Sequence, residues 1–183
     1  MNFEEVIPEV FVVRHFFNEQ QMAIINRFLL STEFKRQNGI RNSYVDSLED
    51  GISEILQDGM KRLKLIIEQT YGCTVAPENQ GTIVKYDIGW TLSPHADVYD
   101  NLPTYGGYPT RDISSLFYLS GGFEGGDLRF VESGTTIRPD AGMAVFFPSN
   151  EEFMHEVTEL TSGDRYTCTS FWHVLEGKYR KQA

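Results

Sequence analysis

The residues of this sequence best suited to metal chemistry are two histidines and an aspartate in its second half. His95 and Asp97 stand in the segment Ser-Pro-His-Ala-Asp, and side chains two positions apart leave the same face of an extended strand. His155 follows an apolar and aromatic run about sixty residues later, where it opens another expected strand. The three side chains can therefore bind one ion if the fold brings them together.

The composition of this trio distinguishes between kinds of metal site. Two imidazoles and one carboxylate on one face of an ion leave the other positions open, as in the facial triad of non-haem Fe(II) oxygenases. Zinc hydrolysis would need a similar triad with a general base, and a structural zinc site would close the fourth position. The sequence has neither a His-Glu-x-x-His helix nor a Cys-x-x-Cys pair. His15 and His173 match no motif, so we expect them to be structural.

Arg165 is the candidate for binding an anion near the metal. It begins the last strong strand, in which alternation places on one side Arg165, Thr167, Thr169 and Phe171. If that side faces inward, the guanidinium needs an anionic partner, and a dicarboxylate co-substrate held by a two-pronged fork would supply one. The alternative is a surface ion pair, for example with Asp164.

Two helices that could support these residues are expected in the first part of the chain. Asn18 and Gln21 form a capping-box pattern, and apolar residues at one-face spacing predict a helix over 18–30. A longer helix begins near Ser47 and ends before Gly72. Between the helices, Asn38-Gly39 in the segment 35–45 indicates a hairpin.

Beyond the second helix the apolar runs become short, β-branched and aromatic, with tight turns between them. Six or more such strands predict a jelly roll, and helices that precede strands predict helices packed on its outer face. One interruption, 98–110, is rich in Tyr, Gly and Pro and is typical of a lid or binding loop. The expected strands are 81–86, 114–120, 127–131, 142–147, 156–160 and 166–172.

Composition excludes several classes of protein. With 183 residues, 40% of them hydrophobic, the chain can bury the core of one domain, and its net charge of −10 disfavours a nucleic-acid partner. No stretch approaches the roughly 18 apolar residues of a membrane span, and the acidic start is unlike a secretory signal. We therefore expect a cytoplasmic protein without a membrane partner, whose Cys73 and Cys168 are reduced structural thiols.

Several of these segments resemble one family. His95-Ala96-Asp97, His155-Glu156-Val157 and Arg165-Tyr166-Thr167 resemble the iron and co-substrate motifs of Fe(II)- and 2-oxoglutarate-dependent dioxygenases. The segment 125–130, Gly-Gly-Asp-Leu-Arg-Phe, is similar to the Gly-Gly-x-Leu-x-Phe strand of the prolyl 4-hydroxylase-like branch. The resemblance spans roughly residues 41 to 172.

The resemblance implies an α+β, mainly β fold: a double-stranded β-helix (jelly roll) with N-terminal helices on its outer face. One catalytic domain would cover 1–183, with helical support and a substrate loop in 1–72 and the jelly-roll core in 73–176. In the implied site, Fe(II) is held by His95, Asp97 and His155, and the distal carboxylate of 2-oxoglutarate by Arg165 and Tyr118, with Tyr86 and Thr167 lining the same pocket.

The resemblance also implies the reaction: O2 decarboxylates 2-oxoglutarate to succinate while a C–H bond is hydroxylated, with ascorbate as a possible further cofactor. We expect a prolyl residue in a protein or peptide as substrate. Arg165 stands where the oxygen-sensing type has arginine and the collagen and plant types have lysine, which favours the oxygen-sensing subgroup or its microbial relatives. Arg41-Asn42-Ser43 is similar to a substrate-covering stretch of prolyl hydroxylases, or is an ordinary hairpin, and Tyr99, Tyr105 and Tyr108 are candidates for a second wall. The alternatives are hydroxylation of a free amino acid or small molecule, or a non-catalytic cupin-like metal-binding or sensing module.

Overall fold

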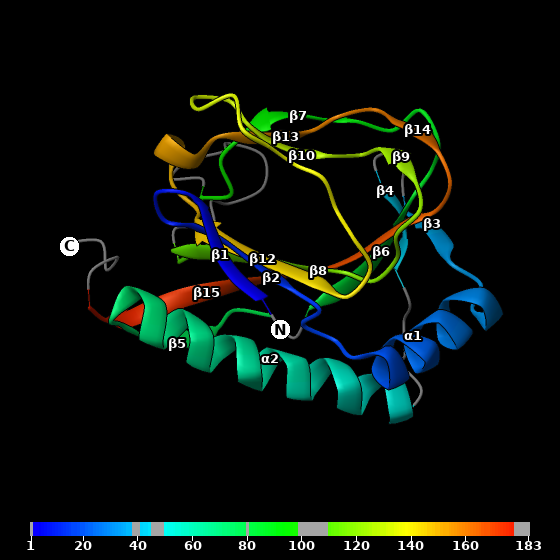
Figure 1. The fold of residues 1–183 in the computed structure, drawn as a ribbon, viewed down its shortest axis with the longest axis horizontal. Coiled ribbons are helices and arrows are strands. Elements are labelled where there is room, and N and C mark those ends of the chain that lie inside the picture. Colours follow the sequence, from blue (N-terminus) through cyan, green and yellow to red (C-terminus); the bar gives the residue numbers. More distant parts are fainter. Residues whose placement is uncertain (1, 38–40, 45–49, 80, 99–109, 178–183) are drawn as a thin grey trace.

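The computed structural model describes residues 2–37, 41–44, 50–79, 81–98 and 110–177. Two antiparallel sheets lie opposite each other, and two helices cover the outer face of the larger one (Figure 1). The larger sheet has the order β1-β2-β12-β8-β15-β5, with β6 also paired to β15. Its strands are β1 (Asn2–Ile7), β2 (Val10–Arg14), β12 (Met143–Pro148), β8 (Ile113–Tyr118), β15 (Arg165–Glu176), β5 (Thr74–Pro77) and β6 (Thr82–Tyr86).

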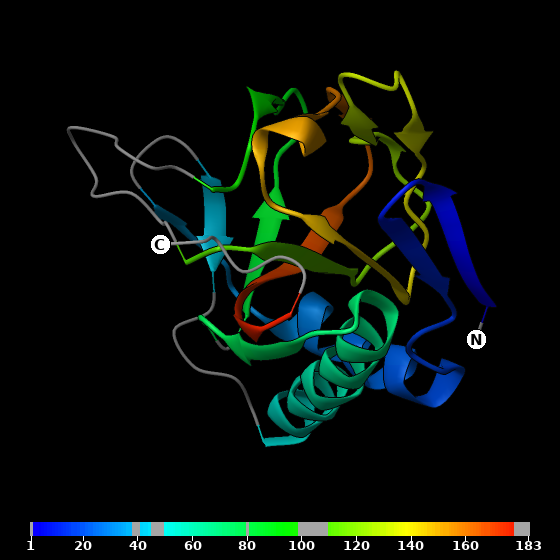
Figure 2. The ribbon, with the colours of Figure 1, turned by 90° about the vertical axis from the view of Figure 1, so that its left-hand side faces the viewer.

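The smaller sheet closes the other side of the barrel, in the order β11-β10-β13-β7. Its strands are β11 (Thr136–Ile137), β10 (Leu128–Phe130), β13 (His155–Val157) and β7 (Leu92–His95). Two further pairs are β14 (Leu160–Ser162) with β9 (Glu124–Gly125), and β3 (Lys35–Gln37) with β4 (Arg41–Tyr44). The view from the side shows the β3–β4 hairpin standing away from the helices (Figure 2). A short 3₁₀ helix, η1 (Glu151–Phe153), precedes β13. This arrangement confirms the predicted jelly roll.

Alternation along the strands of the larger sheet separates two apolar clusters. On β12, Met143, Val145 and Phe147 point into the barrel, whereas Ala144 and Phe146 pack toward the helices. All five side chains are fully buried, since successive side chains of a strand leave opposite faces and both faces are covered. The strand therefore reads as a continuous apolar run.

The helices α1 (Glu19–Ser31) and α2 (Asp50–Tyr71) lie on the outer face of this sheet, as predicted (Figure 1). The predicted capping box is present, because Asn18 and Gln21 exchange side-chain-to-backbone hydrogen bonds. α2 is followed by Gly72, whose φ of +62° suits a residue without a Cβ. α2 buries Leu63 and Ile67 against the sheet, and each such side chain contributes about 1.5–3 kcal/mol.

The order of elements differs from the prediction in two places. Strands β1 and β2 precede the helices and extend the larger sheet through β12, so the assignment of residues 1–72 to helical support and a substrate loop missed two strands of the sheet. The predicted strand 156–160 is divided between β13 and β14, which belong to different sheets. Val157 pairs with Leu128 and Leu160 with Gly125, so the chain changes partner between them.

Some predictions concern segments of which the structure says little. The proposed wall of Tyr99, Tyr105 and Tyr108 lies outside the described residues, as does the turn at Asn38-Gly39. The hairpin itself is present, because β3 pairs with β4. Within the described residues, neither helix combines the length and apolar character that crossing a membrane requires.

Candidate active site

His95, Asp97 and His155 meet at the smaller sheet. His155 opens β13 and pairs directly with His95, the last residue of β7, and Asp97 follows two residues beyond that strand. The Nε2 atoms of His95 and His155 lie 3.5 Å and 3.6 Å from the two carboxylate oxygens of Asp97. One possible ligand atom from each residue lies within 4.8 Å of those of the other two. The described residues contain no other group of this kind.

Each histidine is oriented by its own backbone. Nδ1 of His95 donates to the carbonyl of Ser93 at 2.9 Å, and Nδ1 of His155 donates to that of Phe153 at 3.0 Å. Because a carbonyl only accepts, these bonds place a proton on Nδ1, the tautomer in which Nε2 is the atom that can ligate a metal. Burial also lowers the pKa of His155, against the opposing charge of Asp97, which favours the neutral form that ligates metals.

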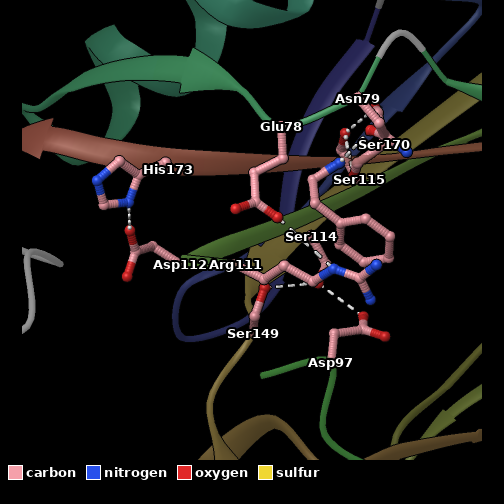
Figure 3. Close-up of polar contacts among 11 residues, drawn as sticks. Glu78, Asn79, Asp97, Arg111, Asp112, Ser114, Ser115, Ser149, Ser170 and His173 are labelled. Carbon is pink, nitrogen blue, oxygen red and sulfur yellow. Dashed lines mark hydrogen bonds and ion pairs between the residues drawn. The ribbon is translucent and has the colours of Figure 1, made fainter. Parts of the chain in front are cut away.

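Asp97 is held as an ionised carboxylate. Burial alone would raise its pKa, but the hydrogen bonds and charges of His95, His155 and Ser114 lower that pKa to about 2. Ser114 Oγ donates to Asp97 Oδ2 at 2.6 Å (Figure 3). A carboxylate between two imidazoles is the donor set of the Fe(II) facial triad.

Arg165 points into the barrel rather than toward solvent. Its side chain is 1% exposed, its Nε donates to the carbonyl of Gly126 at 2.9 Å, and its Cζ lies 4.4 Å from the centre of the Tyr86 ring. Nη1 is buried and has no hydrogen-bond partner in the described part of the chain. Asp164, the alternative partner, instead pairs with Lys85 at 3.1 Å. The structure thus leaves a buried cation with unused hydrogen-bonding capacity.

Tyr118 presents a second unused polar group beside this cation. The residue is fully buried, Arg165 Cζ lies 5.4 Å from its ring centre, and its hydroxyl has no hydrogen-bond partner among the described residues. Burial raises the pKa of Tyr118 to about 12, against the opposing charge of Arg165, so the hydroxyl stays a donor at neutral pH. A guanidinium N–H and a phenol O–H that both lack acceptors fit a carboxylate.

The rest of the cavity is built by strand register. Arg165 pairs with Tyr86, and Thr167 pairs with Tyr118, so neighbouring strands bring these four side chains together. Thr167 Oγ1 donates to Tyr86 Oη at 3.3 Å. The Tyr86 ring also packs on Trp90, with ring centres 4.4 Å apart.

Six of the seven predicted site residues line one cavity: His95, Asp97, His155, Arg165, Thr167 and Tyr86. Thr169 and Phe171 line it as well, so the row of alternate residues predicted on β15 faces inward. Tyr118, the seventh, is fully buried behind Arg165.

Sequence reasoning missed Ser114 and the contact between Gly126 and Arg165. Alternation from Tyr118 back along β8 was a usable signal for Ser114, because it puts Leu116 and Ser114 on the same side as the tyrosine. No local signal existed for the contact of Gly126, because its partner Arg165 lies 39 residues away on β15.

Fold and site together define a double-stranded β-helix protein in which three residues that could hold a metal lie in one cavity with a buried arginine. The family model described as "2OG-Fe(II) oxygenase superfamily" matches residues 81–173, just over half of the chain. The chain belongs to this superfamily, and the match covers all seven predicted site residues. Its enzymes are dioxygenases that use Fe(II), 2-oxoglutarate and O2.

Proteins similar to this chain in sequence include prolyl 3-hydroxylases. Human prolyl 3-hydroxylase 3 is 38% identical over 80 residues, which are 41% of this chain and 11% of that protein. Prolyl 3-hydroxylase 1 of Gallus gallus is 34% identical over a segment of the same length. The chain therefore matches only about a tenth of the length of these relatives.

Solved structures share the fold at low sequence identity. The viral collagen prolyl hydroxylase of Paramecium bursaria chlorella virus-1, in complex with 2-oxoglutarate, has a TM-score of 0.71 and 16% identity, covering 92% of this chain and 97% of that one. The prolyl-4-hydroxylase of Pseudomonas putida has a TM-score of 0.64 and 23% identity, covering 90% and 92%. A Trichoplax adhaerens prolyl hydroxylase in complex with a hypoxia inducible factor peptide has a TM-score of 0.65 and 17% identity, covering 90% and 83%.

Proposed function

We propose that this chain carries a catalytic domain that hydroxylates a prolyl residue in a protein or peptide. In this proposal His95, Asp97 and His155 bind Fe(II), and Arg165 and Tyr118 bind the carboxylate of 2-oxoglutarate that lies away from the metal. When bound, Fe(II) and 2-oxoglutarate would supply the electrons that activate O2: one oxygen atom of O2 would enter the C–H bond, and the other would enter 2-oxoglutarate, which leaves as succinate and CO2.

The chain's own residues prepare the site for this chemistry. The backbone hydrogen bonds of His95 and His155 fix both Nε2 atoms toward the metal position, so little reorganisation accompanies binding. Arg165 fixes the far end of the co-substrate, which sets how deeply its other end reaches toward the triad. Thr167 and Tyr86 form the wall beside Arg165, and the hydrogen bond between them holds that wall in place.

One observation carries the choice of an enzyme over a non-catalytic metal-binding module. Arg165 Nη1 and Tyr118 Oη are both buried and without partners in the described residues. In a protein that only bound a metal, each of these two unsatisfied groups would lower the stability of the fold by about 1–3 kcal/mol, and no bound ligand would offset the loss. A bound dicarboxylate removes that cost.

The choice of a prolyl substrate rests on the relatives and on the cavity wall. The relatives and structural neighbours named above are prolyl hydroxylases, and one was solved with a peptide. Phe171 also lines the cavity, and Arg111 Cζ lies 3.7 Å from the centre of its ring. An aromatic wall suits an apolar ring such as that of proline.

The test begins with the co-substrate. Anaerobic addition of Fe(II) and 2-oxoglutarate should give a visible absorption band, and succinate should form in air. D97A should give neither while keeping the circular dichroism spectrum of the wild type, and D87N, whose carboxylate does not line the cavity, is the matched control. Absence of both band and succinate in the wild type would contradict the oxygenase function.

The substrate class is tested separately. Proline-containing peptides, and a host proteome treated with wild type or D97A, are compared by mass spectrometry for the gain of one oxygen on proline. Free proline and other free amino acids are assayed in parallel. Turnover of a free amino acid without any peptide hydroxylation would overturn the peptide assignment and leave the oxygenase in place.

A further inference from the structure

Two buried serines stand behind the carboxylate of Asp97 (Figure 3). Ser114 lies on β8, and Ser149 directly follows β12; each is 1% exposed. Ser114 Oγ is 2.6 Å from Asp97 Oδ2 and 2.7 Å from Ser149 Oγ. The pairing of Ser114 with Phe147 on β12 brings the two serines together, although they are 35 residues apart in sequence.

The direction of the hydrogen bonds follows from the number of protons available. An ionised carboxylate only accepts, so the single hydroxyl proton of Ser114 goes to Asp97. Ser114 then has only lone pairs to offer Ser149, so Ser149 must donate to it. The result is a one-way chain from Ser149 through Ser114 to Asp97, and each donor in such a chain is strengthened by the one behind it.

The main chain of Ser149 also holds Asp97. Its carbonyl accepts from the N–H groups of Asp97 and Val98, both at 3.1 Å, and its own N–H donates to the carbonyl of Asp112 at 3.0 Å. Ser149 therefore fixes the backbone of Asp97 directly and the carboxylate through Ser114. Asp97 lies past the end of β7, where no strand pairing would otherwise hold it.

We propose that Ser114 and Ser149 are positioning residues that orient Asp97 as a metal ligand, an inference that rests on the proposed metal site. With Oδ2 engaged by Ser114, the carboxylate cannot rotate about its last bond without breaking a short charge-assisted hydrogen bond. The rotation that this bond fixes keeps the carboxylate oxygens at 3.5–3.6 Å from the two Nε2 atoms. Neither serine needs to touch the ion.

A purely structural role for the pair is the competing explanation, and the chain contains a matched control. Ser115, the next residue of β8, pairs with Ser170 through an Oγ–Oγ contact of 2.7 Å, and both are fully buried. Ser115 accepts from Trp172 Nε1 at 2.8 Å, and the pair has no contact with Asp97. The two serine pairs thus match in residue type, burial and distance, and differ in what they hold.

The test is a Co(II) titration of the full chain, with thermal unfolding of each variant in parallel. S114A should weaken Co(II) binding by about 10- to 100-fold, the usual loss when an outer partner of a metal ligand is removed. S149A should weaken it in the same direction by a smaller factor, because Ser114 keeps its bond to Asp97. S114T, which restores the hydroxyl, should recover most of the affinity. S115A should lower the unfolding temperature and leave the Co(II) dissociation constant within about twofold of the wild-type value. Substitutions at sites that share no hydrogen-bond network have nearly independent effects.

The outcomes separate this inference from the function on which it rests. If D97A loses Co(II) binding but S114A and S149A bind as the wild type does, only the role of the serines is overturned. Equal weakening by S115A and S114A would likewise make the serines structural. If D97A and the wild type bind Co(II) equally, the proposed metal site itself is wrong.

Discussion

The contact between Gly126 and Arg165 allows a sharp prediction about co-substrate binding. A Cβ at residue 126 would lie 2.8 Å from Arg165 Cδ and 3.2 Å from its Nε, whereas ordinary contacts begin at 3.4 Å. In G126A the Arg165 side chain must therefore retreat by roughly half an ångström or more, a shift that weakens geometry-dependent contacts. Its Nε would also leave the Gly126 carbonyl, which now holds it at 2.9 Å.

The size of the effect follows from the hydrogen bond that the displaced Arg165 would no longer make to the carboxylate of 2-oxoglutarate. A hydrogen bond to a charged group contributes about 1.5–3 kcal/mol. At about 1.4 kcal/mol for each factor of ten, G126A should raise the dissociation constant of 2-oxoglutarate by roughly 10- to 150-fold. Fe(II) affinity should not change, because the triad does not touch Gly126.

Gly134 supplies the matched control. Its φ of +66° equals that of Gly126, +64°, within two degrees, but a Cβ there would meet nothing within 4 Å. G134A therefore carries the same backbone penalty, about 1–2 kcal/mol, without the contact to Arg165. The assay is an anaerobic titration of the Fe(II) protein with 2-oxoglutarate, followed by absorption. Equal dissociation constants for G126A and G134A would refute the reasoning.

Two further predictions concern Tyr118 and the helix-facing core. Y118F should weaken 2-oxoglutarate binding by roughly 2- to 12-fold, which corresponds to the loss of one hydrogen bond. Its free energy of unfolding should be equal to or higher than that of the wild type, because the change removes a buried hydroxyl without a partner in the described residues. A less stable variant with unchanged binding would show that the hydroxyl is structural. L63A should lower the free energy of unfolding by about 2–5 kcal/mol in urea titrations and leave metal affinity unchanged, because Leu63 is fully buried between α2 and the sheet, far from the triad.

The parts of the site that the sequence predicted are those governed by short-range rules. A period of two placed Arg165, Thr167 and Phe171 on one face of a strand, and the structure has all three in the cavity wall. The spacing of His95 and Asp97 likewise predicted two side chains on one side, and both line the cavity. The capping box at Asn18 located the start of α1.

The parts that it did not predict depend on distant partners. β2 is a short apolar run that joins the larger sheet through β12, and β12 is more than a hundred residues away. Ser149 follows Pro148 in a segment with no periodic pattern, and only the fold shows that it faces Asp97. Such contacts are set by topology, which a single sequence does not encode locally.

The two faces of β15 differ in what they contact, and this determines which sequence changes the strand can accept. Alternate residues from Arg165 to Phe171 face the cavity, while Tyr166, Cys168 and Trp172 pack in the helix-side core. Substituting only the residues that face the cavity should therefore change co-substrate preference while leaving the helix-side core intact. A single inserted residue would do the opposite, because a shift of one position exchanges the two faces and would put the core residues into the cavity. We expect natural variation in this strand to consist of substitutions and to be almost free of insertions and deletions.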